Sequence, residues 1–309
     1  MLGIINNYDL SDDIVKAALN DKYNVKANYV YRTDRVKYPT NVIYNTGVFN
    51  DFSMFDWKNI VANNPEKWIK SIQTIKYSPN GQSLEEKDIN NKYSAVKYAY
   101  SDILPVITAN NARYDNIYFN NFESELIPMN IAHSGSNSLN YTNNPDFKIT
   151  NTLILDNELI QQGANIRLWL KSTTNNAAPD FKIKLNNNLA EYPFKKVAQT
   201  GDWSLFESNI KEWAGLTAGA SLDIALDYTL NQGEEVFIDD IRFQPTVAQA
   251  TCYVYDPLNF RLVAQFNDQH FATFYQYNEE GKLIRIMVET ERGLKTVKET
   301  QYNIPRKVL

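Results

Sequence analysis

The sequence has little of the chemistry on which most enzymes and metal proteins depend. Of its 309 residues, one is a cysteine, Cys252, and two are histidines, His133 and His270. A lone cysteine excludes an intramolecular disulfide and cysteine-based zinc sites. Two histidines leave few groups for triads and metal-assisted hydrolysis. A carboxylate-only mechanism such as glycoside hydrolysis stays open, but we predict a protein that is not an enzyme.

Nucleotide-binding and hydrolase motifs, excess positive charge and long apolar runs are also missing. No GxGxxG, GxxxxGK[ST], HExxH or GxSxG motif occurs. The net charge of -5 makes nucleic acid an unfavourable partner. No apolar run approaches the roughly 18–20 residues of a membrane-spanning helix. The start, MLGIINNYDLSDD, has no signal-peptide pattern, so we expect either an intracellular chain or a piece whose export signal lies elsewhere.

What the sequence does have is aromatic residues, which make up 13% of the chain and include 20 tyrosines. The tyrosines alternate with β-branched and polar residues in short runs such as 28–32, 253–255 and 273–277, a habit of half-buried strands. One helix is expected from Ser11, where Asp12 and Asp13 favour a helix start. The fold class predicted is therefore mostly β.

Three zones follow one another along the chain. Residues 1–116 are tyrosine-rich and interrupted by turn sequences, which predicts an irregular β region with a short N-terminal helix. Residues 117–246 contain evenly spaced apolar strands, which favours an antiparallel jelly-roll β-sandwich. These strands are expected at 152–155, 166–170, 181–185, 221–228 and 236–243. Residues 247–309 place a Tyr-Asx step at a hairpin turn twice, after Tyr255 and after Tyr277.

The hairpin segments carry a resemblance to a known repeat. The stretch 275–283, YQYNEEGKL, with the earlier Tyr255-Asp256, resembles the tyrosine-aspartate (YD, or RHS-type) repeat YxYDxxGRL, with Asn278 for Asp and Lys282 for Arg. Two such copies are too few to wind a large shell. Together with segments 75–85, 104–106 and 109–114, the chain resembles the C-terminal parts of large surface or secreted proteins of Bacteroidota, in which such segments flank a jelly roll. The resemblance covers roughly residues 50–300.

The middle zone resembles carbohydrate-binding-module and galactose-binding-like jelly rolls. The resemblance rests on NFE at 121–123, AHSGSNSL at 132–139 and FIDDI at 237–241. In that family the first and last strands of the jelly roll lie side by side, and a structural calcium is often held where these segments meet. The resemblance therefore implies that Asn121–Glu123 approaches the closing strand.

The closing strand has a peculiarity of its own. Strict alternation puts Asp239 on one face with Phe237, Ile241 and Phe243, so a carboxylate shares a face with apolar side chains. A buried charge needs a partner. Calcium, which takes six to eight oxygen ligands, would satisfy Asp239 or Asp240 together with Glu123 and the carbonyls of the Ser134-Gly135-Ser136 turn. The alternative is that Asp239 caps backbone amides at a strand end and Asp240 pairs with Arg242 or a neighbouring lysine.

A sugar-binding surface is expected around Trp169. In the strand 166–170, Ile166, Leu168 and Leu170 form the core face, which leaves Trp169 between Arg167 and Lys171 on the polar face. An exposed indole is a stacking platform for a sugar ring, with Asp223 and Asp227 as hydroxyl acceptors. The alternative is that Trp169 is covered by a neighbouring loop or by the first zone, residues 1–116.

The remaining single residues are expected to be structural. His133 is expected to make hydrogen bonds in its turn, His270 to lie on a strand and Cys252 to be a small buried side chain.

Taken with the resemblance, these patterns predict a secreted or cell-surface module for carbohydrate binding or adhesion, whose partner is a glycan or surface polysaccharide. The resemblance implies export by the type IX secretion route. The alternative function is a structural spacer, or a cargo or accessory subunit of the type IX secretion or gliding apparatus.

Overall fold

The protein is mostly β, as predicted: strands account for 53% of the structure and helices for 5%. The computed structural model describes residues 4–9 (backbone), 24–32, 53–123, 131–174, 180–186 and 190–302, so the helix expected from Ser11 lies outside the described residues. Within these ranges, no helix is long and apolar enough to cross a membrane. The chain divides into two compact units, residues 1–95 and 96–309, and each is described by itself.

The first unit is a run of antiparallel strands joined in sequence order. It contains β1 (Ile4–Asp9), β2 (Asn24–Tyr31), β3 (Trp68–Tyr77), β4 (Ser83–Asp88) and the first residues of β5 (Tyr93–Ala99), with a 3-10 turn at Ile60–Ala62. The alternating tyrosines Tyr29 and Tyr31 face a small aromatic core with Phe55 and Trp68. Tyr31 meets Trp68 edge to face at 4.9 Å between ring centroids.

One hairpin turn recurs in both units. Each copy is a five-residue turn in which the first residue makes three hydrogen bonds. Its backbone N–H donates to the carbonyl of the fifth residue, and its carbonyl accepts from the N–H of the fourth. Its side-chain oxygen accepts from the N–H of the fifth residue. The fourth residue has a positive φ, as a type I turn followed by a bulge requires. The four copies span residues 78–82, 88–92, 267–271 and 278–282. Their fourth residues are Gly81, Asn91, His270 and Gly281.

The second unit contains an antiparallel sheet of consecutive hairpins. Its order is β6 (Leu104–Asn110), β17 (Gln249–Tyr255), β18 (Leu262–Phe266), β19 (Ala272–Tyr277), β20 (Leu283–Thr290) and β21 (Gly293–Glu299). Turns follow Tyr255 and Tyr277, at the two places that the sequence indicated. β6 pairs with β17, which lies far from it along the chain.

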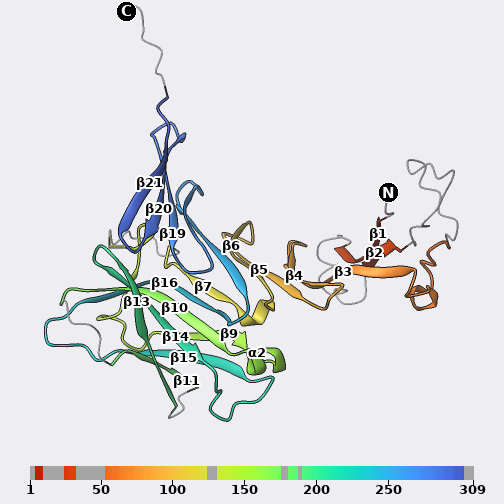
Figure 1. Ribbon diagram of the computed structural model, residues 1–309, viewed down its shortest axis with the longest axis horizontal. Coiled ribbons are helices and arrows are strands. Elements are labelled where there is room, and N and C mark those ends of the chain that lie inside the picture. The colour runs from red at the N-terminus through yellow and green to blue at the C-terminus, as the bar shows by residue number, and fades with distance from the viewer. Residues whose placement is uncertain are drawn as a thin grey trace, which may run out of the picture. The chain divides into compact units, whose positions relative to one another are not determined.

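Two further antiparallel sheets of the second unit enclose the main hydrophobic core. One consists of β13 (Lys195–Thr200), β14 (Trp203–Ile210), β10 (Ala164–Ser172), β16 (Val236–Pro245) and β7 (Tyr118–Asn120), with β8 (Leu139–Asn140) also on β16. The other consists of β12 (Glu191–Pro193), β11 (Lys182–Leu185), β15 (Ser221–Asp227) and β9 (Lys148–Ile154). The 3-10 turn Tyr114–Asn116 precedes β7, and the short helix α2 (Asn157–Gln162) follows β9. Figure 1 labels β7, β10, β13, β14 and β16 of the first sheet and β9, β11 and β15 of the second.

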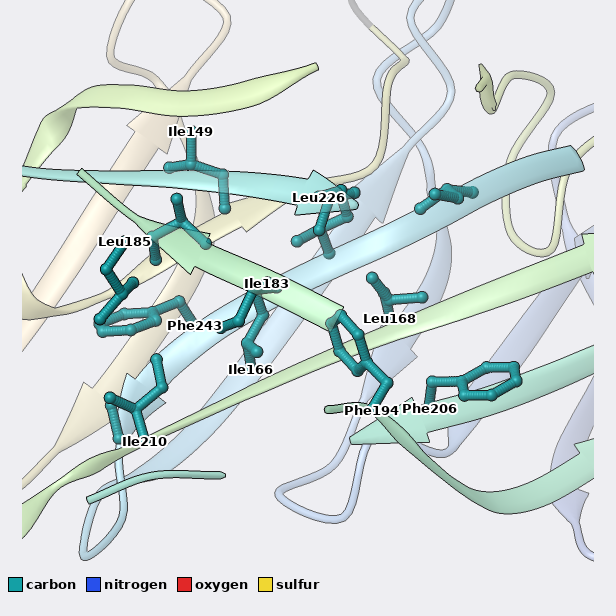
Figure 2. Close-up of a cluster of buried hydrophobic side chains, with 14 of the residues drawn as sticks. Ile149, Ile166, Leu168, Ile183, Leu185, Phe194, Phe206, Ile210, Leu226 and Phe243 are labelled. Atoms are coloured by element: carbon teal, nitrogen blue, oxygen red, sulfur yellow. The ribbon is translucent and has the colours of Figure 1, made fainter. Parts of the chain in front are cut away.

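Side chains from both sheets meet in one core. Ile166 and Leu168 of β10 and Phe243 of β16 belong to the same buried cluster as Ile183 of β11 and Leu226 of β15. Figure 2 shows these side chains pointing toward one another between the strands. The core face predicted for 166–170 is therefore confirmed: Ile166, Leu168 and Leu170 all belong to the cluster.

The strand that opens the middle zone lies beside the strand that closes it. Tyr118, Phe119 and Asn120 of β7 pair with Phe243, Arg242 and Ile241 of β16. Asn121–Glu123 follows directly, so Glu123 is held near this edge of the sheet. β9, β10, β11, β15 and β16 all overlap the strands expected from hydrophobic spacing.

Candidate functional site

Trp169 lies on the predicted face of β10 but is completely buried. Its side chain is 0% exposed. The indole stacks on the His133 ring with 4.0 Å between centroids and 12° between planes. Its Nε1 donates to the carbonyl oxygen of His270 at 3.2 Å. The expectation of an exposed platform is therefore wrong, because the turn at 267–271 and the His133 segment cover this face, which was the alternative.

The cations flanking Trp169 are also engaged. Arg167 donates to Glu207 Oε2 at 2.5 Å and to the carbonyl oxygen of Asp268 at 2.6 Å, so it helps to fasten the covering turn. Lys171 forms an ion pair with Asp202 at 3.0 Å. Burial favours a higher pKa for Glu207, but the hydrogen bonds from Arg167 and Asn209, with the charge of Arg167, outweigh it and lower the pKa.

The two predicted hydroxyl acceptors do not approach Trp169. Asp223 and Asp227 belong to β15, in the four-stranded sheet, whereas Trp169 belongs to β10 in the other sheet. Because Leu222, Ile224 and Leu226 fill the core between the sheets, the aspartates alternate to the outer side of β15. Asp227 pairs there with Lys184 at 2.6 Å. The five residues expected to bind sugar thus form no single surface.

A β-bulge in β16 decides where the two closing aspartates go. Arg167 pairs with Arg242 and Trp169 with Asp239, so β16 has one residue more than β10 between these pairs. Asp240 takes the left-handed conformation there, with φ of 52°. The strict alternation expected along 236–243 is therefore wrong: Ile238 and Ile241 both face the core, and Asp239 does not share their face.

The residues expected to hold calcium do come together, but around hydrogen-bond donors. Asp239 Oδ2 accepts from the backbone N–H groups of His133 and Ser134 at 2.8 and 3.2 Å, and Oδ1 accepts from the N–H of Asp240. Asp240 Oδ1 accepts from the Ser134 hydroxyl at 2.7 Å. Asp239 thus caps backbone amides, as the alternative proposed, but it does so at the bulge inside β16 and not at a strand end.

His133 lies between two carboxylates of this cluster. Its Nδ1 lies 2.8 Å from Asp240 Oδ2 and its Nε2 lies 2.9 Å from Glu289 Oε1, while the imidazole is 3% exposed. Both ring nitrogens face carboxylates, which only accept when ionised, so the geometry favours the doubly protonated ring. Burial alone lowers the pKa of His133, but the bonds and charges of Asp240 and Glu289 raise it above 6.5. Asp240 thus pairs with a histidine, not with the expected Arg242 or lysine.

His270 lies in a turn, not on a strand as expected. It is the fourth residue of the 267–271 turn and has a φ of 72°. Its Nε2 lies 2.6 Å from the carbonyl oxygen of Asp240, so Nε2 carries the proton. Burial and the nearby Arg242 charge hold the pKa of His270 well below 6.5, and the ring is neutral. Arg242 donates to the carbonyls of Asn267 and Asp268 and closes the same turn.

Glu123 differs from the two aspartates in how its two carboxylate oxygens are bonded. Oε1 accepts from the N–H groups of Ser136 and Asn137 at 2.7 and 2.8 Å. Oε2 is buried and has no hydrogen-bond partner among the described residues. Burial raises the pKa of Glu123.

These donors do not fit a calcium ion shared by Glu123, Asp239 and Asp240. The aspartate oxygens point at N–H and O–H donors and at an imidazolium, all of which repel a cation. Ser134 and Ser136 are engaged as donors to the carboxylates as well. In the described part of the chain, no group of three or more His, Cys, Asp or Glu side chains is arranged to hold a metal.

Chelation is therefore expected to leave thermal stability unchanged. If no cation bridges the carboxylates, there is no binding free energy to remove, whereas a bound ion at a hundredfold excess over Kd would contribute about 2.7 kcal/mol. The measurement is a thermal melt in excess EGTA and in excess calcium. A midpoint that falls with EGTA in the wild type, but not in Asp239→Ala, would restore the metal.

Glu123 is also one of the residues that line a cavity. It has a volume of about 790 Å³ and is lined by Tyr100, Phe119, Asn120, Glu123, Asp256 and Phe260, among others. This volume is within the roughly 300–1,000 Å³ of small-ligand sites. The residues that line the cavity come from the β5–β6 turn, the segment after β7, the turn after Ser134 and the β17–β18 turn.

The aromatic wall of the cavity is built from strained turns. Tyr100, Ser101 and Asp102 have φ of 54°, 60° and 61°, and Phe260 has φ of 58°. Left-handed conformations are costly for residues with a side chain and gather at ligand sites. The Tyr100 and Phe260 rings meet edge to face at 5.3 Å, and the Tyr100 hydroxyl donates to the carbonyl oxygen of Tyr255 at 3.3 Å. Phe260 remains 54% exposed.

The sequence patterns did not reveal this cavity. Tyr100 and Phe260 lie in turns 160 residues apart, and only the pairing of β6 with β17 brings those turns together. One signal was available: Leu258 and Phe260 are apolar residues in a turn after Tyr255-Asp256-Pro257, where polar residues are usual.

Cys252 is a small buried side chain, as expected. Burial raises its pKa to about 12, so it is not a nucleophile at neutral pH. Comparison with known proteins adds no assignment to this geometry: the chain matches no protein-family model and no curated protein sequence.

Proposed function

We propose that the chain is a non-catalytic carbohydrate-binding module with a jelly-roll core and RHS-like hairpins, whose sugar site is the cavity of Tyr100, Glu123 and Phe260. The observation that carries the proposal is the composition of this cavity. The lining combines the aromatic side chains of Tyr100, Phe119 and Phe260 with the amide and carboxylate side chains of Asn120, Glu123 and Asp256. Sugars need this combination, because their C–H faces stack on aromatic rings and their hydroxyls need acceptors.

The strand pairing supports the jelly-roll part of the proposal. β7 and β16 lie side by side, as the opening and closing strands of such a fold do. The sugar site that we propose is displaced from Trp169 to the edge of the sheet beside this pair, where Asn120 ends β7.

Binding is favoured over catalysis by the condition of the carboxylates. General acid and base groups must reach the substrate. Asp239, Asp240 and Glu289 are enclosed and committed to His133, Ser134 and backbone N–H groups. Of the two carboxylates that line the cavity, Asp256 accepts hydrogen bonds at both oxygens and Glu123 at Oε1. This leaves one carboxylate oxygen for a sugar, whereas glycoside hydrolysis uses a pair of carboxyl groups. The resemblance to surface proteins of Bacteroidota extends the proposal to a secreted or cell-surface location and a glycan or surface polysaccharide as partner.

A second candidate, a rigid spacer or a subunit of the type IX secretion or gliding apparatus, is favoured by a different observation. The stack of His133 on Trp169, with the bonds of His133 to Asp240 and Glu289, ties the sheet of β10 and β16 to the hairpin sheet. Such a joint keeps two sheets in one fixed arrangement, which a spacer requires.

Phe260→Ala is expected to weaken glycan binding by about tenfold or more, as truncation of an aromatic anchor does. Folding is expected to persist because Phe260 is 54% exposed. The measurement is a glycan-array screen followed by calorimetric titration of the wild type and the variant. Val247→Ala, an apolar truncation at a similarly exposed turn outside the cavity, is the control. If the folded wild type binds no glycan, the spacer becomes the leading function.

A further inference from the structure

We infer that the cavity selects a glycan unit carrying a protonated amine, a 2-amino sugar, whose ammonium group pairs with the free carboxylate oxygen of Glu123. This inference rests on the proposed function. It names the class of sugar and the atom that selects it.

Glu123 offers one specific atom to a ligand. Its Oε1 is held by two backbone N–H groups on the 134–137 turn. A Cβ placed on Gly135 would lie 2.3 Å from Oε1, so the turn closes that side completely. The residue is 1% exposed, and Oε2 has no hydrogen-bond partner among the described residues. A buried carboxylate oxygen left unpaired is destabilising, and a donor from a ligand removes this penalty.

The charge of the cavity favours a cationic donor over a neutral one. Asp256 is a second carboxylate in the lining, and no lysine, arginine or histidine lines the cavity in the part of the chain that the structure describes. Burial and the negative charges of Glu123 and Asp256 raise the pKa of Tyr100 to about 12. The same negative field attracts an ammonium group and repels a sugar carboxylate.

Asp256 contributes to the negative charge of the cavity, but both of its carboxylate oxygens already accept hydrogen bonds. Its Oδ1 accepts from the N–H of Leu258 at 2.8 Å and its Oδ2 from the Asn259 amide at 2.6 Å. These bonds fix the turn that presents Phe260. Glu123 therefore supplies the direct contact and Asp256 supplies charge.

The aromatic side chains of the cavity fit the apolar part of the proposed ligand. An edge-to-face pair such as Tyr100 and Phe260 presents a ring face for the C–H side of a pyranose, and ring faces also attract cations. A protonated amino sugar has the matching features, an apolar C–H face and one positive charge at its edge. Calcium would need six to eight oxygen ligands, which one free carboxylate oxygen does not provide.

The test is calorimetric titration at near-neutral pH with three probes: an oligosaccharide of glucosamine, the matching N-acetylglucosamine oligosaccharide and an oligogalacturonate. We expect the wild type to bind the glucosamine probe most tightly and the galacturonate least. Glu123→Gln keeps an acceptor for the two N–H groups but removes the charge, and should weaken glucosamine binding about tenfold to a hundredfold while leaving the N-acetyl probe nearly unchanged. Glu291→Gln, an exposed glutamate outside the cavity, should change neither.

Asp256→Asn is the second variant to be titrated, for the case in which Glu123→Gln does not fold. It keeps an amide oxygen as the acceptor for the Leu258 N–H. It should reduce the preference for glucosamine over the N-acetyl probe. Equal binding of the two probes by the wild type would overturn the amine assignment and leave the sugar-binding function in place. Failure of all three probes, together with a negative glycan array, would overturn both. Calcium titration that gives binding in the wild type and none in Glu123→Gln would also overturn the amine assignment.

Discussion

Trp169→Ala is expected to lower the free energy of unfolding of the second unit by about 3–5 kcal/mol, the range for a buried Trp→Ala change. The indole is 0% exposed and stacks on His133 at 4.0 Å between centroids. Truncation leaves a large cavity beside a charged ring. It also removes the hydrogen bond from Nε1 to the carbonyl oxygen of His270 at 3.2 Å.

Chemical denaturation followed by far-ultraviolet circular dichroism measures this loss. Trp57→Ala is the matched control, because the same atoms are removed from a side chain that is 51% exposed, and a much smaller loss is expected. Trp169→Phe, which keeps a ring but not the donor, should fall between the two. A Trp169→Ala protein as stable as the Trp57→Ala protein would mean that the covering turn opens and that the indole is accessible after all.

His133→Gln is expected to be as damaging, with a loss of about 3–5 kcal/mol, because removing one partner leaves buried charges without compensation. Asp240 and Glu289 are both 0% exposed at their side chains and both face the imidazole. Neutralising one of them should recover part of the loss. The double variant His133→Gln/Glu289→Gln is therefore expected to be more stable than the sum of the single effects predicts.

The contribution of His133 should also depend on pH in a defined direction. Its pKa is raised above 6.5 in the folded state, so the folded protein binds this proton more tightly than the unfolded chain. The stabilisation is then complete below pH 6.5 and is lost as the pH rises through the raised value. His270 acts oppositely, because its lowered pKa reduces stability as the pH falls below 6.5.

The measurement is the difference in unfolding free energy between wild type and His133→Gln at several pH values. We expect it to be largest on the acidic side and to shrink toward alkaline pH. In the described part of the chain, His133 faces Asp240, Glu289 and the rings of Trp169, Trp203, Phe266 and Phe274. Its titratable neighbours are the two carboxylates and His270, whose lowered pKa reflects in part the charge of His133. A difference that is constant with pH would show that the ring is not charged in the folded state.

Much of the fold could be predicted from the sequence because the strands are regular. In β10, Ile166, Leu168 and Leu170 alternate with Arg167, Trp169 and Lys171, and period-2 alternation fixes the face of each side chain. The turn residues were equally informative. Asn278 and Gly281 lie where a side-chain acceptor and a positive φ are needed.

The sites could not be predicted in the same way because they depend on contacts distant in sequence. Nothing near Trp169 indicates that His133 and the 267–271 turn cover it, and nothing near His133 indicates Glu289. The bulge at Asp240 was also hidden, because left-handed backbone is usually marked by glycine or asparagine. Alternation carried across such a position assigns every later residue to the wrong face.

Because of the extra residue in β16, the two faces of this strand contact two different parts of the second unit. On one side Ile238, Ile241 and Phe243 pack into the core of the paired sheets. On the other, Asp239 and Asp240 bond to the 133–134 turn, and Arg242 holds the turn at 267–268. Neither part can melt without exposing the other, so residues 96–309 should unfold cooperatively and resist proteolysis as one body, with no cleavable linker near residue 246.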